Sequence, residues 1–148
     1  MSVALSTNPL VRTVESLYLI LKNPFEFIES DKIYCGDENS INMQNKWMMD
    51  RYFLMNQPII NNNLANYANK VVLNAGILGG DRLVLLEIAK KMSALLSTSG
   101  IKSTTVDMCA FNHTLYMGYE RKLVHGLPVN TIFKAYDVNN KNAWFCHK

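Results

Sequence analysis

The chain has 148 residues, a formal net charge of +3 and a hydrophobic fraction of 49%. This apolar content is typical of one folded domain with a core, here residues 1–148, and excludes an intrinsically disordered chain. No apolar run approaches the roughly 20 residues that cross a bilayer, so the sequence predicts no membrane partner. Basic residues never cluster beyond a pair such as Lys90-Lys91, which favours no specific nucleic-acid partner.

Cysteine usage and the first residues bear on the cellular compartment. Cys35, Cys109 and Cys146 are far apart, form no CxxC pair and are odd in number, so we expect buried free thiols. The first residues lack the basic start and apolar stretch of a signal peptide. Both observations predict a cytoplasmic protein.

Two short strands are predicted in the first part of the chain. The later part of Thr13–Leu21 is rich in branched and aromatic residues and stops just before Pro24, as a strand does. Lys32–Cys35 has the same character and is expected to end at Gly36.

A helix and a polar connector follow. Apolar residues in Ile41–Phe53 recur at helical spacing, and we expect Trp47 and Met48 to lie in the core. Residues 56–69, entered at Pro58, are rich in asparagine. Because asparagine disfavours helix interiors and suits turns, this segment is predicted to be a polar loop or a loosely helical connector.

The second half alternates strands and helices. Lys70–Asn74 is predicted as a strand, Arg82–Ser97 as an amphipathic helix and Thr104–Tyr116 as a second helix. Strands are expected again at Val129–Tyr136 and Ala143–Cys146. This order predicts an α/β fold, a mixed sheet with flanking helices.

The string Asn74–Gly80, NAGILGG, lies between the predicted strand and helix. Three glycines in five residues allow another backbone or a ligand to approach closely, and the next helix offers free N–H groups behind its predicted cap Asp81. The spacing matches neither GxGxxG nor a P-loop, so it indicates no dinucleotide or ATP site. A tight strand-to-helix turn without a ligand is the alternative.

Other polar residues are weaker candidates when taken singly. Asp107 and Asn112 lie five apart on the second predicted helix, and an aspartate at a helix start is already favoured by the dipole. The acidic clusters Asp37-Glu38 and Glu29-Ser30-Asp31 suit hard cations and acid–base chemistry, and are equally typical of solvated turns.

The three histidines show no metal-binding spacing. His113, His125 and His147 form neither an HxH nor an HExxH pattern. Each is therefore read by itself as a structural or solvated residue.

The order of several motifs resembles the C-terminal half of GT-A-type glycosyltransferases, the nucleotide-diphospho-sugar transferase superfamily. These motifs are Leu73–Gly80 before a helix, Val106–Asn112, His125–Val129 and the ending Ala143–Lys148. Tyr18–Phe27 also looks like the segment that follows the metal-binding DxD strand of that family.

The resemblance implies a partial GT-A (Rossmann-like) domain related to enzymes that transfer a sugar from a nucleotide-sugar to a glycan or other hydroxyl acceptor. It implies that Asp107 orients a hydroxyl group as the catalytic residue. It also implies a divalent cation, Mn²⁺ or Mg²⁺, held by Glu15 and His147. The substrate-binding residues implied by the resemblance are Asn74, Ala75, Gly76, Gly79, Gly80, Asn112 and His125.

The sequence departs from that family at its start. Where DxD is expected, Val14–Leu17 has the single carboxylate Glu15, and only about a dozen residues precede it. We therefore expect a truncated or degenerate domain whose exposed sheet edge pairs with a second copy or a partner, or is closed by the first residues. A non-catalytic glycan- or protein-binding module is the alternative; weak nucleic-acid binding rests on the net charge alone.

Overall fold

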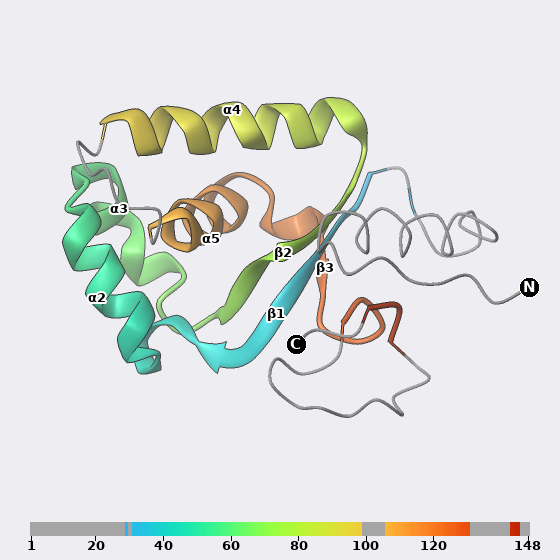
Figure 1. Cartoon of the computed structure of the whole chain (residues 1–148), viewed down its shortest axis with the longest axis horizontal. Helices are drawn as coiled ribbons and strands as arrows, with labels where there is room; N and C mark the ends of the chain where they lie inside the picture. The colour runs from blue at the N-terminus through green and yellow to red at the C-terminus, as the bar shows by residue number, and fades with distance from the viewer. Residues whose placement is uncertain (1–28, 30, 99–105, 131–142, 146–148) are drawn as a thin grey trace, which may run out of the picture.

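The computed structural model describes residues 29, 31–98, 106–130 and 143–145 (Figure 1). The predicted strand in Thr13–Leu21 lies outside these residues, as do residues 131–136 and 146 of the last two predicted strands. The described parts of those two, at 129–130 and 143–145, form no strand and contribute only an isolated bridge. The helices and strands are β1 Ile33–Ile41, α2 Lys46–Met55, α3 Pro58–Asn63, β2 Val71–Gly80, α4 Arg82–Thr98, α5 Asp107–Gly118 and β3 Leu123–His125. Short 3-10 turns cover Asn42–Gln44, Leu64–Asn66 and Glu120–Lys122.

The strands form a mixed sheet in the order β2-β1-β3. β1 is antiparallel to β2 and parallel to β3, with Cys35 paired to Leu78 on one side and to His125 on the other. An isolated parallel bridge joins Asn130 to Phe145. Helices flank this sheet, so the predicted α/β fold is confirmed (Figure 1).

Two bulges interrupt the pairing of β1 with β2. Cys35 pairs with Leu78, but the next residue, Gly36, pairs with Asn74. Residues 75–77 of β2 therefore have no partner on β1, and we call this segment the β2 bulge.

The second bulge lies on β1. Asp37 pairs with Leu73 and Ile41 with Val71, so residues 38–40 stand opposite the single residue between those partners. The two bulges lie on opposite strands, at neighbouring positions of the β1–β2 pair. Extra residues of this kind bend the strands and increase their twist locally.

The strand predictions are corrected at both glycine-containing segments. The predicted turn at Asn74–Gly80 is wrong, because β2 runs through to Gly80 and only its middle bulges. Likewise β1 does not end at Gly36 but continues to Ile41. A Cβ on Gly36 would lie 3.4 Å from the Asn74 Cβ, so glycine here permits close strand pairing instead of ending the strand.

Helix α5 is central to the fold and lies between α4 and the sheet in Figure 1. Every residue from Cys109 to Tyr116 is buried, whereas Ile88 alone is buried on α4. The predicted α4 is confirmed to within a residue at its end. Its predicted cap is also confirmed: Asp81 Oδ1 accepts the N–H groups of Leu83 and Val84 at 2.8 and 3.2 Å.

The first helix starts later than the sequence predicts. Asn42–Gln44 forms a 3-10 turn, and α2 begins at Lys46 because the Asn45 side chain caps it by accepting the Met48 N–H. Met48 is buried as predicted, but the predicted core position of Trp47 is wrong, since this residue is 41% exposed. Of the two forms predicted for the connector at 56–69, the structure has the loosely helical one, which contains α3 and a 3-10 turn.

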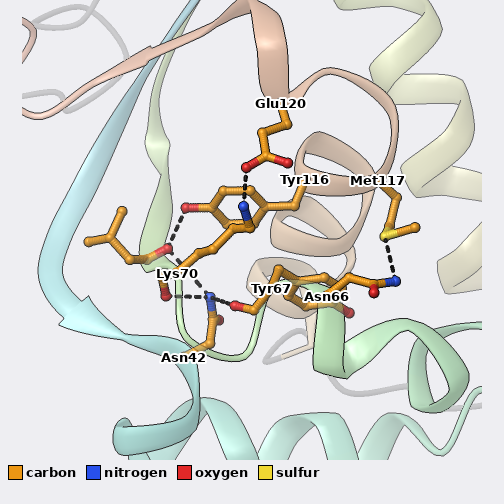
Figure 2. A network of polar contacts seen from close by, with 8 residues as sticks. Asn42, Asn66, Tyr67, Lys70, Tyr116, Met117 and Glu120 are labelled. Carbon is orange, nitrogen blue, oxygen red and sulfur yellow. Dashed lines mark hydrogen bonds and ion pairs between the residues drawn. The ribbon is translucent and has the colours of Figure 1, made fainter.

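A polar network joins the end of β1 to α5 at the connector (Figure 2). The Asn42 side-chain amide donates to the main-chain oxygens of Tyr67 and Lys70, at 3.3 and 3.1 Å. Above them, the Tyr116 hydroxyl donates to the Val71 oxygen at 2.7 Å. These bonds satisfy buried main-chain groups where the chain enters β2.

Two of the cysteines behave as predicted. Cys35 and Cys109 are buried free thiols, and burial raises the pKa of each to about 12. Cys146 lies outside the described residues.

Among the helices of the described ranges, none has the length and apolar character needed to cross a membrane.

Candidate functional site

Asn74 links the two bulges of the β1–β2 pair. Its Nδ2 donates to Glu38 Oε1 at 2.8 Å, and its Oδ1 accepts the Gly76 N–H at 2.7 Å. The second bond is an Asx turn, which fixes the β2 bulge from within. Gly76 is exposed, so bare main chain lies beside the side chains of Asn74 and Glu38. We call Glu38, Asn74 and Gly76 the bulge cluster.

Asn112 attaches α5 to the strand beside this cluster. Its Oδ1 accepts the Leu73 N–H, and its Nδ2 donates to the oxygens of Leu73 and Met108, all at 2.8–2.9 Å. Asn112 is fully buried and its amide is used by the main chain. These bonds give Asn112 a structural part in positioning α5, and its predicted role in substrate binding stays a prediction.

The start of α5 lies at the β2 bulge. The Ala75 N–H points to Met108 Sδ at 3.4 Å, and Ala75 itself is half-buried. Asp107 precedes Met108 as the first residue of the helix, where a carboxylate is favoured by the helix dipole. Its side chain is exposed and makes no hydrogen bond with a described residue, Asn74 and Glu38 included.

A second polar pair involves Asp37, the residue of β1 that precedes Glu38. His125 Nδ1 is 3.0 Å from Asp37 Oδ2, with the two side chains 32% and 15% exposed. Asn130 fixes the main chain of Asp37, accepting its N–H at 3.3 Å and donating to its oxygen at 3.1 Å. We call Asp37 and His125 the Asp–His pair.

Gly126 completes the surroundings of this pair. Its φ of +69° lies in the left-handed region, and a Cβ there would be 2.8 Å from Asp37 Oδ2. Glycine is therefore required both by the backbone conformation and by the carboxylate.

The bulge cluster and the Asp–His pair are adjacent but distinct. Successive side chains of a strand point to opposite faces, so Asp37 and Glu38 direct their partners to different sides of β1. The resemblance in the sequence implied Asn74, Gly76 and His125 as site residues, but not Glu38, Asp37 or Asn130. The acidic pair Asp37-Glu38 was the one signal for them, and it is equally typical of a turn.

The remaining glycines lie at the other end of β2. Gly79 pairs with Tyr34, and Gly80 pairs with Ile33. A Cβ on Gly80 would be 2.9 Å from the Lys32 oxygen, and its φ of +147° leads into α4. Both glycines serve strand pairing and the strand end, apart from the bulge cluster.

The predicted metal ligands Glu15 and His147 lie outside the described residues, so the Mn²⁺ or Mg²⁺ site stays a prediction. Within the part of the chain that the structure describes, no three acidic, histidine or cysteine side chains gather as a metal site would require. His113 has a structural place, hydrogen-bonded to the Tyr67 hydroxyl at 3.1 Å in the core.

A comparison with known protein families, curated proteins and solved structures finds no match for this chain.

Proposed function

We propose that the chain is a glycosyltransferase-like domain that binds a carbohydrate at the bulge cluster. Its substrates would be a nucleotide-sugar and a glycan or other hydroxyl acceptor. The observation that carries the proposal is Asn74, which bonds Glu38 and the Gly76 N–H beside exposed main chain. The order of motifs that resembles the GT-A family supports it independently.

The chemistry of the bulge cluster suits sugar hydroxyls. Asn74 uses one amide hydrogen and one lone pair of its oxygen within the cluster, which leaves a donor and an acceptor. The second oxygen of the Glu38 carboxylate adds a charged acceptor. Because each sugar hydroxyl both donates and accepts, neighbouring hydroxyls fit such an alternating set.

The missing side chain of Gly76 matters as much as the polar groups. A pyranose ring presents its hydroxyls around a bulky ring, which must approach the strand closely. Exposed glycine main chain in a bulge allows this approach.

Asp107 takes the second role in the proposal. The contact of Met108 with Ala75 places the start of α5 at the bulge, and the exposed Asp107 carboxylate is not engaged by any described residue. We assign it to orienting a hydroxyl group of the acceptor or of the donor sugar.

A cytoplasmic location and self-association through a sheet edge belong to the same proposal. Light scattering after size-exclusion chromatography tests the self-association.

Ligand-induced stabilisation tests the proposal. Melting temperature is measured with UDP- and GDP-sugars, each with Mn²⁺, and with free monosaccharides. A ligand at 100 times its Kd adds about 2.7 kcal/mol, which is a rise of roughly 5–10 °C for a domain of this size.

Paired variants assign the binding to the bulge cluster. Asn74→Ala is expected to abolish the rise, whereas Asn61→Ala on the exposed face of α3 preserves it. A rise with free glycan but with no nucleotide-sugar identifies the non-catalytic module instead. If no saccharide or nucleotide-sugar raises the melting temperature, the proposed function is wrong.

A further inference from the structure

We infer that one face of α2 is the contact surface of a two-fold symmetric homodimer. This face is formed by Trp47, Asp50, Arg51 and Leu54, and we call it the α2 face. The inference does not depend on the proposed function, and it concerns a surface outside the sheet. Its evidence is the exposure of the apolar side chains and the chemistry of the two charges beside them.

Exposed apolar side chains gather around α2. Of the nine large hydrophobic side chains that the described residues expose, five lie in the short segment 43–59, namely Met43, Trp47, Phe53, Leu54 and Ile59. The others are spread over α4, α5 and the residues after β3. In Figure 1, α2 lies at the edge of the molecule, farther from the sheet than α5. Such a concentration of exposed apolar groups marks a site where another protein binds.

The four residues of the α2 face lie along one side of the helix. Their positions i, i+3, i+4 and i+7 are neighbours on a helix surface. Trp47 is 41% exposed and Leu54 is 51% exposed, whereas the residues that α2 buries follow a different stripe, which begins at Met48. The α2 face is thus the side of the helix turned away from the core.

The aromatic residue of this face is held in place before any partner binds. Arg51 Cζ lies 4.5 Å from the centre of the Trp47 ring, a cation–π contact that restrains both side chains. Both ends of α2 are also fixed, by the Asn45 cap and by the hydrogen bond from the Asn56 N–H to the Tyr52 oxygen. A restrained tryptophan loses little conformational entropy on binding, and Trp and Arg are enriched among the residues that contribute most to protein interfaces.

Two charges of opposite sign adjoin the apolar residues. Arg51 forms no ion pair with a described carboxylate, and its Nε has no hydrogen-bond partner among the described residues. The Asp50 side chain is 49% exposed and accepts a hydrogen bond from Lys46 Nζ at 2.8 Å, which leaves lone pairs for further donors. The α2 face therefore offers a guanidinium that can take a carboxylate and a carboxylate that can take a guanidinium.

A second copy of the chain supplies both partners at once. Across a two-fold axis, if residue i contacts residue j of the other copy, then j contacts i in return. Asp50 and Arg51 are consecutive and lie at the same level of α2, so each Asp50 can meet the Arg51 of the other copy. Trp47 and Leu54 of both copies then lie above and below these pairs. A partner whose charges were all of one sign would leave one of the two residues unmatched.

The first experiment measures the mass of the full chain by sedimentation equilibrium. One helix from each copy makes a small interface, so we expect a Kd in roughly the micromolar range. The mass is expected to rise with concentration from the 16.8 kDa of one chain towards twice this value. The mass of one chain even at about 1 mM, where a micromolar dimer is fully formed, overturns the inference.

The second experiment assigns the dimer to the α2 face. Leu54→Ser removes an exposed apolar contact and is expected to raise Kd about tenfold or more. Leu83→Ser, at a 66% exposed position on α4, is the matched control and is expected to leave Kd unchanged. If Leu54→Ser dimerises as tightly as the control, the dimer forms through another surface, such as the sheet edge, and the inference is wrong.

The third experiment tests the pairing of charges. Asp50→Arg and Arg51→Asp each place like charges opposite one another, and each variant alone is expected to be monomeric. An equal mixture of the two variants restores both pairs and is expected to dimerise, as is the double variant D50R/R51D. Circular dichroism confirms that each variant folds. Folded single variants that dimerise like the unaltered protein, or a mixture and a double variant that both stay monomeric, overturn the proposed pairing.

Discussion

Asn74 and Glu38 connect the two bulges of the β1–β2 pair, with 2.8 Å between Asn74 Nδ2 and Glu38 Oε1. Each residue lies where the regular register breaks, Asn74 just before the β2 bulge and Glu38 at the start of the bulge on β1. The polar contact therefore stabilises two irregularities at once. It also places an acidic side chain, an amide and bare main chain together between β1 and β2.

Asn112 is predicted to be essential for stability. Asn112→Ala leaves the N–H and oxygen of Leu73 buried without partners, which costs about 3 kcal/mol. Urea unfolding followed by circular dichroism measures this loss. Asn61→Ala, on an exposed asparagine, is the matched control and is expected to change stability by less than about 0.5 kcal/mol. Equal effects of the two substitutions would contradict the anchoring role.

Gly126 is predicted to tolerate no side chain. Gly126→Ala puts a Cβ 2.8 Å from Asp37 Oδ2 and strains a left-handed backbone. We expect a loss of about 1–3 kcal/mol and a changed His125 ring spectrum. Gly118→Ala is the control, because its Cβ meets nothing nearer than Lys91 Nζ at 3.8 Å. A Gly126→Ala protein with unaltered stability and spectrum would show that this packing does not hold the Asp–His pair.

Acid is predicted to destabilise the core through His113. Burial lowers the pKa of His113 from its ordinary value of 6.5. Below pH 6.5 the unfolded chain therefore binds a proton that the folded protein resists, and the free energy of unfolding falls as pH falls. One such site contributes at most about 1.4 kcal/mol per pH unit.

Unfolding at pH 7.5 and pH 5 measures this effect of His113. His113→Gln, which cannot titrate, is expected to lose less stability over the same interval than the unaltered protein. An identical pH dependence in the two proteins would remove His113 as the cause.

The buried thiols are predicted to be unreactive. Cys35 and Cys109, each with a pKa raised to about 12 by burial, carry almost no thiolate at neutral pH. Iodoacetamide labelling mapped by mass spectrometry is expected to leave both unmodified in the native protein and to modify both in urea. Rapid native labelling at either residue would mean that the core opens there.

The sequence by itself determined the elements whose signals are local. The periodic apolar residues and the Asp81 cap predicted α4, and the alternation of strands and helices predicted the mixed α/β sheet. The resemblance-based roles of Asp107, Glu15 and His147 remain predictions.

Tertiary structure decided the rest, because it depends on pairing between distant segments. The string Asn74–Gly80 reads locally as a turn, and only hydrogen bonding with β1 makes it a bulged strand. The burial of Asn112 comes from its hydrogen bonds to Leu73 of β2, which is distant in sequence. Asp37 and His125 are 88 residues apart, and no local pattern reveals that β1 and β3 bring them together.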